Sequence, residues 1–362
     1  MKSRRRPSDS KELLNEKNNV AEILPGRLYY CTLSQAPNAS LYTDCNFFTT
    51  DNTLQYFNFF LDFGPLNLSQ LYRFCMLLNR KLADEHLKGQ KIVYYSGTHG
   101  HKRANSVCLL ASWSVIFQNQ SPDEAFRPFQ NHHPRFPYFH DASPVVCTYN
   151  LSILDCLMGL SKARQLGFFD FRKFDPQEYE YYEEVENGDL NWLADGKFIA
   201  FAGPQEKKFG ALPNYRLTPP EYYIPYFRKG NVKLVVRLNK KYYDENKFIN
   251  AGIDHLHLYY LDGSVPPKAT LDQFLAACER YMDGAIAVHC KAGLGRAGTC
   301  IGCYMMKHYR MTAAEVIGWL RIVRPGSIIG PQQHYMKEME GAMWQEGEAF
   351  RAGRRLAAAA AA

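Results

Sequence analysis

The segment Ala285–Thr299 constrains the fold of this 362-residue chain more than any other part of its sequence. It begins with an apolar, β-branched run that predicts a buried strand, continues through a loop punctuated by glycines, and leads into an apolar helix expected over residues 300–309. A strand, a tight loop and a helix N-terminus form an anion site, because the loop N–H groups point inward and the helix dipole adds about half a positive charge. We expect a phosphate group to bind at this loop.

Two side chains within this segment predict a reaction rather than binding alone. Cys290 lies at the end of the strand, where inward N–H groups, the helix dipole and a nearby cation favour the nucleophilic thiolate. Arg296 offers a planar fork that matches two phosphoryl oxygens, the atoms that carry charge during phosphoryl transfer. The pair predicts a cysteinyl-phosphate intermediate. A buried apolar thiol is the alternative for Cys290, but it explains neither the glycines nor the arginine.

The pair His289–Cys290, followed after five residues by Arg296, matches the signature of cysteine-dependent protein phosphatases. The residues between them resemble the version found in the cell division cycle fourteen family of dual-specificity phosphatases. The resemblance implies that these residues bind phosphate: Lys291, Ala292, Gly293, Leu294 and Gly295. It also implies hydrolysis of phosphoserine or phosphothreonine before proline, and of phosphotyrosine, in cell-cycle control. Neither a metal nor an organic cofactor is expected, since the paired histidines lack companion ligands at zinc-site spacing.

The composition favours a two-domain intracellular protein. With 46% hydrophobic and 14% aromatic residues, the chain can bury a large core, and its length favours two domains. No apolar run is long enough to span a bilayer, and residues 1–22 lack the apolar segment of a secretory signal, so no membrane partner is expected. Ten scattered cysteines indicate reduced thiols. The resemblance implies nucleus and cytoplasm, with nucleolus, centrosome or spindle as further locations.

The charge balance favours protein partners over nucleic acid. The net charge of +7 is modest, and the basic stretch at residues 2–6 is better explained as part of a solvated, disordered tail over 1–22 than as a nucleic-acid patch. The acidic linker described below would repel polyanions, which also disfavours a lipid or RNA phosphatase. We therefore expect phosphorylated proteins as substrates, and the sequence leaves a homodimer open.

The predicted fold class is α/β, and residues 23–166 predict a first domain that repeats the order seen around Cys290. A buried strand is expected over 91–95, a loop follows, and a helix is expected over 102–117. Arg103 corresponds to Arg296, but no cysteine stands at the nucleophile's place. We interpret this as a degenerate, non-catalytic copy of the phosphatase unit, with an unrelated α/β unit as the alternative. The resemblance supports two tandem phosphatase-like domains of which only the second is active.

Residues 167–191 predict an acidic linker helix between the two domains. Asp175 and the proline after it make a helix start, and Glu180 and Glu183 then lie on one face. A solvated face on a linker is the simplest interpretation of that stripe. In the resembling family, however, the linker borders an acidic groove that favours Lys or Arg a few residues after a phosphoserine–proline pair. The resemblance therefore places Glu180, Glu183 and Asp189 at a substrate groove.

The predicted catalytic domain spans 192–350, and 351–362 is interpreted as a low-complexity tail. A departing serine or threonine alkoxide is strongly basic, so its release needs a proton donor above the pocket. Asp262 follows a half-buried strand expected over 254–260. An Asp–Gly pair alone usually indicates a turn. Its position before the catalytic strand matches the mobile acid loop of these phosphatases, and Asp262 is therefore the expected general acid.

Two further features concern breakdown of the phosphoenzyme. Gln332 and Gln333 could aim a water at phosphorus, as a glutamine loop does in related phosphatases, although an ordinary helix start is the alternative. The family usually has Ser or Thr after the arginine, where this chain has Ala297, and Thr299 is too far along to replace it. Slow turnover with accumulating phosphoenzyme is expected. A phosphoprotein-binding pseudophosphatase is the alternative function.

Overall fold

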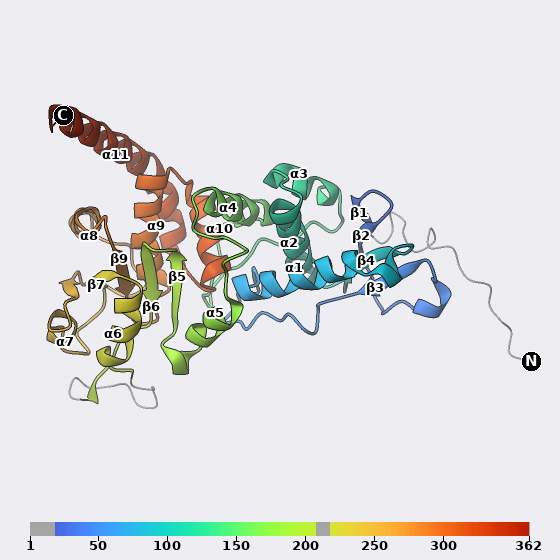
Figure 1. Ribbon diagram of the computed structural model, residues 1–362, viewed down its shortest axis with the longest axis horizontal. Coiled ribbons are helices and arrows are strands. Elements are labelled where there is room, and N and C mark those ends of the chain that lie inside the picture. Colours follow the sequence, from blue (N-terminus) through green and yellow to red (C-terminus); the bar gives the residue numbers. More distant parts are fainter. Residues whose placement is uncertain (1–18, 208–217, 362) are drawn as a thin grey trace, which may run out of the picture. The chain divides into compact units, whose positions relative to one another are not determined.

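The computed structural model describes residues 19–207 and 218–361, and its contacts divide the chain into two compact units (Figure 1). The first comprises described residues up to 57 together with 63–139 and 152–157, and the second comprises 58–62, 140–151 and 158 onward. Two short segments of the N-terminal half, as well as the predicted linker, thus group with the second unit. Most of the predicted N-terminal tail lies outside the described residues.

The first unit is built on a four-stranded sheet of order β1-β2-β4-β3. Strand β4 lies between β2 and β3 and runs parallel to both, whereas β1 pairs with β2 in the antiparallel sense. The strands are β1 (Ala21–Leu24), β2 (Leu28–Thr32), β3 (Cys45–Phe48) and β4 (Lys91–Ser96). The helices that begin in this unit are α1 (Leu68–Ala83), α2 (Gly100–Phe117), α3 (Pro122–Phe126) and α4 (Ile153–Gln165).

Local sequence signals account for several of these elements. Asn67 caps α1 through a reciprocal pair of hydrogen bonds with Gln70, and Ser121 caps α3 in the same way with Glu124. The predicted strand at 91–95 and helix at 102–117 correspond to β4 and α2, so the first unit contains the strand–loop–helix order expected of a degenerate copy.

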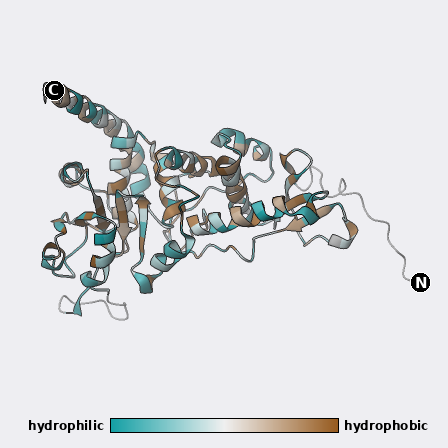
Figure 2. Cartoon of the chain, viewed as in Figure 1, coloured by the Kyte–Doolittle hydropathy of each residue, from teal (hydrophilic) through white to brown (hydrophobic). Residues whose placement is uncertain are grey.

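The second unit contains a five-stranded sheet of order β5-β6-β9-β7-β8. Strand β9 is central and parallel to both of its neighbours, and β5 is antiparallel to β6. The strands are β5 (Leu190–Ala194), β6 (Phe198–Phe201), β7 (Val232–Arg237), β8 (Asp254–His257) and β9 (Ala285–His289). Every residue of β6 and β9 is buried, and hydrophobic residues, brown in Figure 2, gather on these strands.

The second unit also contains helices before, between and after these strands in the sequence. They are α5 (Pro176–Glu183), α6 (Pro220–Lys229), α7 (Asn246–Ile249), α8 (Lys268–Arg280), α9 (Gly295–Tyr309), α10 (Ala313–Val323) and α11 (Pro331–Ala361). Helix α9 packs against α10 and α11. Residues 351–361, interpreted from sequence as a tail, continue α11, since alanine has the highest helix propensity. Within the described ranges, no helix is both long and apolar enough to cross a bilayer.

Candidate active site

Strand β9 delivers Cys290 to the start of a loop that enters α9 at Gly295. The thiol is free and the residue is only 3% exposed. Gly293 in this loop has a φ of 68°, and a Cβ there would lie 2.1 Å from the carbonyl oxygen of Phe201. Only glycine fits both conditions, because other residues rarely adopt this φ and none can occupy that space. The tight loop predicted from the glycines is therefore present.

The carbonyl groups of the loop are held from outside by Arg324, which comes from the end of α10. Its Nε donates to the Gly293 carbonyl at 2.9 Å, and its Nη2 donates to the Ala292 carbonyl at 2.8 Å. In a trans peptide the N–H points opposite to the C=O, so the amides of Gly293 and Leu294 face away from Arg324. Arg324 therefore orients the N–H groups that would bind an anion.

Arg324 is itself fixed by two side chains at the start of β5. Its Nη1 donates to Asn191 Oδ1 at 2.6 Å, and its Nη2 pairs with Asp189 Oδ1 at 2.7 Å. The resemblance placed Asp189 in a substrate groove, and Arg324 was not among the predicted site residues. In the structure the Asp189 carboxylate is paired with Arg324, and it acts on the loop through that arginine. The arginine next to a Pro–Gly pair was the available sequence signal, but it does not identify the acceptors.

Arg296 lies at the second position of α9 and is 3% exposed. Its Nη1 donates to the Tyr260 carbonyl at 2.9 Å, and the Tyr260 hydroxyl donates to the Arg296 carbonyl at 3.1 Å. These contacts hold the guanidinium in one orientation. Its Nε is buried without a hydrogen-bond partner among the described residues. Because buried donors are normally satisfied, this atom is available to an oxyanion.

Asp262 lies next to this guanidinium. Its Oδ1 is 3.0 Å from Arg296 Nη2, and its side chain is 65% exposed. The neighbouring Gly263 has a φ of 74°, and its N–H donates to Asp262 Oδ1 at 3.1 Å. The structure therefore brings together the predicted phosphate-binding arginine and the predicted general acid, with the acid on the solvent side.

His289 supports the loop from the buried side. Burial lowers the pKa of this histidine to about 3, so the ring is neutral at pH 7. Its Nδ1 lies 3.1 Å from the Cys290 carbonyl, and its Nε2 lies 2.8 Å from the Tyr243 hydroxyl. Since the carbonyl can only accept, we assign the proton to Nδ1. The Tyr243 hydroxyl also lies 2.7 Å from His255 Nε2, so this hydroxyl links the two histidines.

The two glutamines of the predicted water-positioning pair differ in their surroundings. Gln332 accepts from the Ile329 N–H at 2.9 Å and donates to the Ser264 carbonyl at 3.0 Å. A Cβ on Gly295 would lie 2.7 Å from Gln332 Oε1, so this amide lies beside the loop that runs from Cys290 to Gly295, called the phosphate loop below. Gln332 thus lies between Ser264, in the loop that carries Asp262, and Gly295 at the start of α9.

Gln333 is directed to other partners. Its Oε1 accepts from Arg321 Nη2 at 2.6 Å, and its Nε2 donates to the Gly330 carbonyl at 3.2 Å. In this conformation the side chain accepts a hydrogen bond from a buried guanidinium. Both glutamines were candidates for water positioning from the sequence, and that role stays a prediction.

The acidic face of α5 is partly covered. Glu180 and Glu183 are half-buried, and Tyr179 donates both to Glu183 Oε1 at 3.2 Å and to the Val323 carbonyl at 2.8 Å. Those bonds fix α5 against the end of α10. Glu184, which follows the helix, is exposed. This region therefore carries negative charge close to the Arg324 cluster that holds the phosphate loop.

The residue after Arg296 contributes no hydroxyl. Ala297 is fully buried, and the Thr299 Oγ1 donates to the Gly295 carbonyl at 2.8 Å. Thr299 is thus engaged within its own helix, as its distance along the sequence suggested. In this conformation neither residue offers a hydrogen bond to a departing thiolate.

Comparisons with known families match both halves of the chain. The family described as "Dual specificity protein phosphatase, N-terminal half" matches residues 22–163. The family described as "Polymorphic toxin system, DSP-PTPase phosphatase" matches residues 214–310, a range that contains Asp262, Cys290 and Arg296. The degenerate and catalytic units expected from sequence each correspond to a phosphatase family.

Relatives that match most of this chain are also protein phosphatases. The chain is 50% identical over 334 residues to "Dual specificity protein phosphatase CDC14A" of Mus musculus, covering 92% of this chain and 55% of that protein. It is 44% identical over 348 residues to "Dual specificity protein phosphatase CDC14B" of Mus musculus, covering 96% and 71%. It is 44% identical over 324 residues to "Tyrosine-protein phosphatase CDC14 homolog" of Schizosaccharomyces pombe, covering 88% and 60%. The chain thus spans about half the length of the CDC14A relatives that it matches.

Proposed function

Because the chain belongs to the CDC14 family of dual specificity protein phosphatases, we propose that its second unit hydrolyses phosphoserine, phosphothreonine and phosphotyrosine in proteins through a cysteinyl-phosphate intermediate. The observation that carries this proposal is the constellation at the phosphate loop. Cys290 begins the loop, the Arg296 guanidinium faces Asp262, and Arg324 turns the loop carbonyls outward. In this proposal Cys290 is the nucleophile and Asp262 the acid. Arg296 and the loop N–H groups bind the phosphoryl oxygens.

In the first chemical step the Cys290 sulfur attacks phosphorus and the ester bond to the substrate oxygen breaks. The substrate phosphate takes the place of the Asp262 carboxylate at Arg296, whose unpartnered Nε and adjacent Nη2 then bind two phosphoryl oxygens. Asp262, displaced toward the leaving oxygen and protonated, donates its proton as the alcohol departs. The charge of the transferring group is held by Arg296 and by the loop amides.

In the second step a water attacks phosphorus and the thiolate leaves. Gln332 lies between the acid loop and the start of α9, where its amide can hold that water, and Asp262 accepts the proton that the water loses. The departing thiolate receives no hydroxyl hydrogen bond from Ala297. We therefore propose that this step limits turnover.

Substrate choice follows from the charge beside the site. Glu180 and Glu183 on α5, together with the exposed Glu184, favour substrates with Lys or Arg downstream of the phosphorylated residue. We propose that the phosphorylated residue precedes proline. Asp189 contributes to this region mainly by fixing Arg324.

The names of the CDC14 relatives support a role in cell division for this chain as well. We propose that it acts on phosphoproteins in the nucleus and cytoplasm, with the nucleolus, centrosome or spindle as sites of action. Recognition of these substrates requires neither nucleic acid nor a membrane, and a homodimer is compatible with it.

A pseudophosphatase that binds phosphoproteins is the second candidate, and Ala297 is the observation that favours it. A phosphopeptide panel separates the two functions by varying the residue after phosphoserine and the basic residues beyond it. If the protein is an enzyme, the parent should release phosphate and Cys290→Ser should release none. The parent should prefer peptides with Pro directly after phosphoserine and Lys beyond it. Equal release by both proteins would remove Cys290 from the mechanism.

A further inference from the structure

The first unit buries a cation to which the described residues supply no anion. Arg103, at the fourth position of α2, is 2% exposed, and its Nε and Nη2 have no hydrogen-bond partner among residues 19–207 and 218–361. No carboxylate of the described chain lies within ion-pair distance of it. A buried charge without a partner is strongly unfavourable, so such a guanidinium points to a ligand.

A second unpartnered side chain lies at the same place. His132 is 5% exposed, and neither of its ring nitrogens has a hydrogen-bond partner within the described ranges. Both residues contact Phe136: the Arg103 guanidinium carbon lies 4.9 Å from the ring centre, and the two ring centres are 5.8 Å apart. The positive charge of Arg103 also lowers the pKa of His132, after the larger effect of burial. The two side chains therefore lie close together in the interior of the first unit.

The strands beneath this region contribute hydroxyl groups. Tyr30 stacks on His132 with ring centres 5.9 Å apart, and its hydroxyl is 2.7 Å from Ser96 Oγ at the end of β4. Thr32, paired with Ser96 across the sheet, has a buried Oγ1 without a partner in the part of the chain that the structure describes. The region thus lies at the carboxyl ends of two parallel strands, where open α/β sheets bind ligands.

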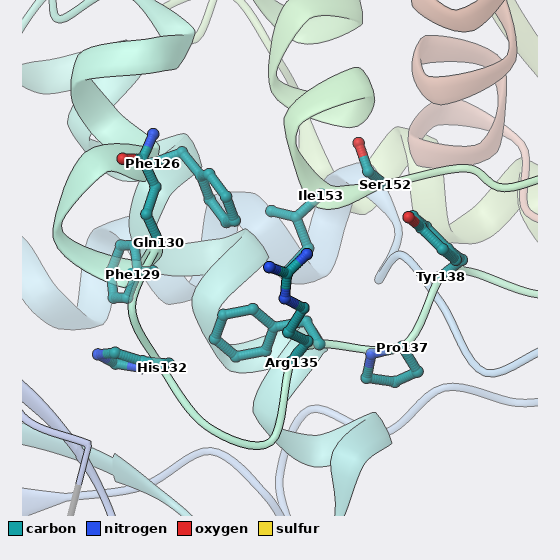
Figure 3. Close-up of a pocket in the computed structure, with 10 residues that line it drawn as sticks. Phe126, Phe129, Gln130, His132, Arg135, Pro137, Tyr138, Ser152 and Ile153 are labelled. Atoms are coloured by element: carbon teal, nitrogen blue, oxygen red, sulfur yellow. The ribbon is translucent and has the colours of Figure 1, made fainter.

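A nearby cavity provides an approach for a small anion. It measures about 260 Å³, and Phe136 is one of the residues that line it. His132 also lies at its wall (Figure 3). None of the residues that line it is acidic, and Arg135 extends into it. The cavity therefore concentrates negative rather than positive ions.

The active site of the second unit provides an internal comparison. There, too, an arginine early in the helix after a central parallel strand has a buried, unpartnered Nε, in Arg296. In Arg103 the whole Nε–Nη2 edge is unpartnered, and this edge matches two oxygens of one oxyanion. The backbone anion loop itself is not open in the first unit, because Asp51 accepts from the Gly97 N–H at 2.7 Å and lies 3.8 Å from Lys102.

We propose that the first unit binds a free tetrahedral oxyanion of the phosphate class between Arg103 and His132. The guanidinium edge holds two oxygens, and the His132 N–H and the Thr32 hydroxyl donate to the others. Burial of all three side chains excludes a phosphorylated peptide segment and selects a small inorganic ion. The degenerate unit has lost the nucleophile but kept an anion site on its arginine.

Crystals of the full chain soaked in tungstate, a phosphate mimic with a strong anomalous signal, test the position directly. The proposal predicts an anomalous peak within hydrogen-bonding reach of Arg103 Nε and Nη2, in addition to one at the loop of Cys290. A peak at the Cys290 loop alone, or only water-sized density at Arg103, would overturn it.

Equilibrium dialysis with labelled inorganic phosphate tests the energetics in solution. In full-length Arg296→Ala, which disables the active site, one phosphate should still bind per chain. Adding Arg103→Lys keeps the charge but removes the fork, and should weaken binding about tenfold to a hundredfold. Lys102→Gln is the matched control, since it removes a neighbouring charge without touching the fork, and binding should stay unchanged. No binding in Arg296→Ala, or equal effects of both substitutions, would contradict the proposal.

A competition experiment and an activity measurement complete the test. A phosphoserine peptide should not compete with labelled phosphate in Arg296→Ala, and competition would show that the site takes a phosphorylated segment instead of a free ion. Arg103→Lys in the otherwise unchanged chain should retain phosphatase activity. Its retention separates loss of this site from misfolding and from failure of the proposed enzymatic function.

Discussion

The carboxylate of Asp262 pairs with the guanidinium of Arg296, with 3.0 Å between Oδ1 and Nη2. In the free protein, the proposed acid therefore pairs with the guanidinium that is proposed to bind phosphate. A substrate phosphate must displace the carboxylate before it can use both donors of the fork. Under the proposed mechanism, Asp262 therefore opposes ground-state binding of phosphate and assists departure of the alcohol.

Asp262→Asn should separate these two effects. Loss of the proton donor should lower kcat for phosphoserine peptides by about 10² to 10⁴. Loss of the negative charge should at the same time tighten inhibition by inorganic phosphate. Steady-state kinetics with phosphate as competitor measures both. Asp272→Asn is the control, because this acid pairs with Lys268 on the surface of α8. Weaker phosphate inhibition, or an unchanged kcat, would count against the assignment.

Arg324→Lys should disorder the phosphate loop without removing charge. Lysine can keep the pairing with Asp189 but cannot also serve Asn191 and the carbonyls of Ala292 and Gly293. We expect kcat/KM to fall about tenfold to a hundredfold, because one or two charge-assisted hydrogen bonds are lost. Asp189→Asn should produce a smaller loss.

A purely structural role for Arg324 would change stability and leave the affinity for anions in the remaining folded protein untouched. Inhibition by tungstate, a phosphate mimic, distinguishes the cases. The proposal predicts weaker tungstate inhibition in Arg324→Lys, and inhibition equal to that of the parent would contradict it. Arg310→Lys is a matched control, since Arg310 is exposed and pairs with Glu348 away from the loop.

Gln332→Ala and Gln333→Ala should give different defects. Gln332 lies beside Gly295, so its loss should slow hydrolysis of the phosphoenzyme and increase the trapped intermediate. Loss of Gln333 removes one acceptor of the buried Arg321 Nη2, which also donates to the Ile328 carbonyl, and this should lower the free energy of unfolding by about 1 to 3 kcal/mol. Acid quench measures the first effect and urea unfolding the second. If Gln333→Ala raised the trapped intermediate and Gln332→Ala did not, the water-positioning role would move to Gln333.

Acid should destabilise the second unit through His289. Burial holds its pKa at about 3, whereas an unfolded histidine has a pKa of about 6.5. Between these values the unfolded chain binds a proton that the folded chain does not, so stability present above pH ~6.5 is lost as the pH falls toward 3. Each such histidine contributes at most about 1.4 kcal/mol per pH unit. His289→Asn should reduce the pH dependence of urea unfolding, and identical slopes would contradict this account.

The sequence was most informative where the decisive contacts are local. The apolar run before Cys290 and the glycines after it predicted β9, the loop and α9, because strand, turn and helix preferences act over a few residues. The start of α10 is likewise fixed locally, because Thr312 and Glu315 form a capping box there. The position of Asp262 was expected from its loop, but its pairing with Arg296 required the structure.

Long-range contacts account for what sequence reasoning missed. Asp189 and Arg324 are separated by 135 residues, and only the folded sheet brings them together at the loop. The same holds for the four hydrogen-bond acceptors of Arg324, which cannot be inferred from the spacing of residues in the sequence. The unpartnered atoms of Arg103 could not be foreseen either, since its correspondence with Arg296 indicates only a degenerate copy of the catalytic unit and does not report which of its atoms lack partners among the described residues.

Trapping of phosphate on Cys290 during turnover tests the central claim most directly. Because Ala297 offers the departing thiolate no hydroxyl, breakdown should limit the parent, and acid quench of a labelled phosphopeptide reaction should show a burst with label on Cys290. Ala297→Ser should speed breakdown about tenfold to a hundredfold and reduce the trapped label. Cys290→Ser should show neither label nor release. An unlabelled Cys290 in the parent during turnover, or phosphate release by Cys290→Ser at the parental rate, would contradict the account.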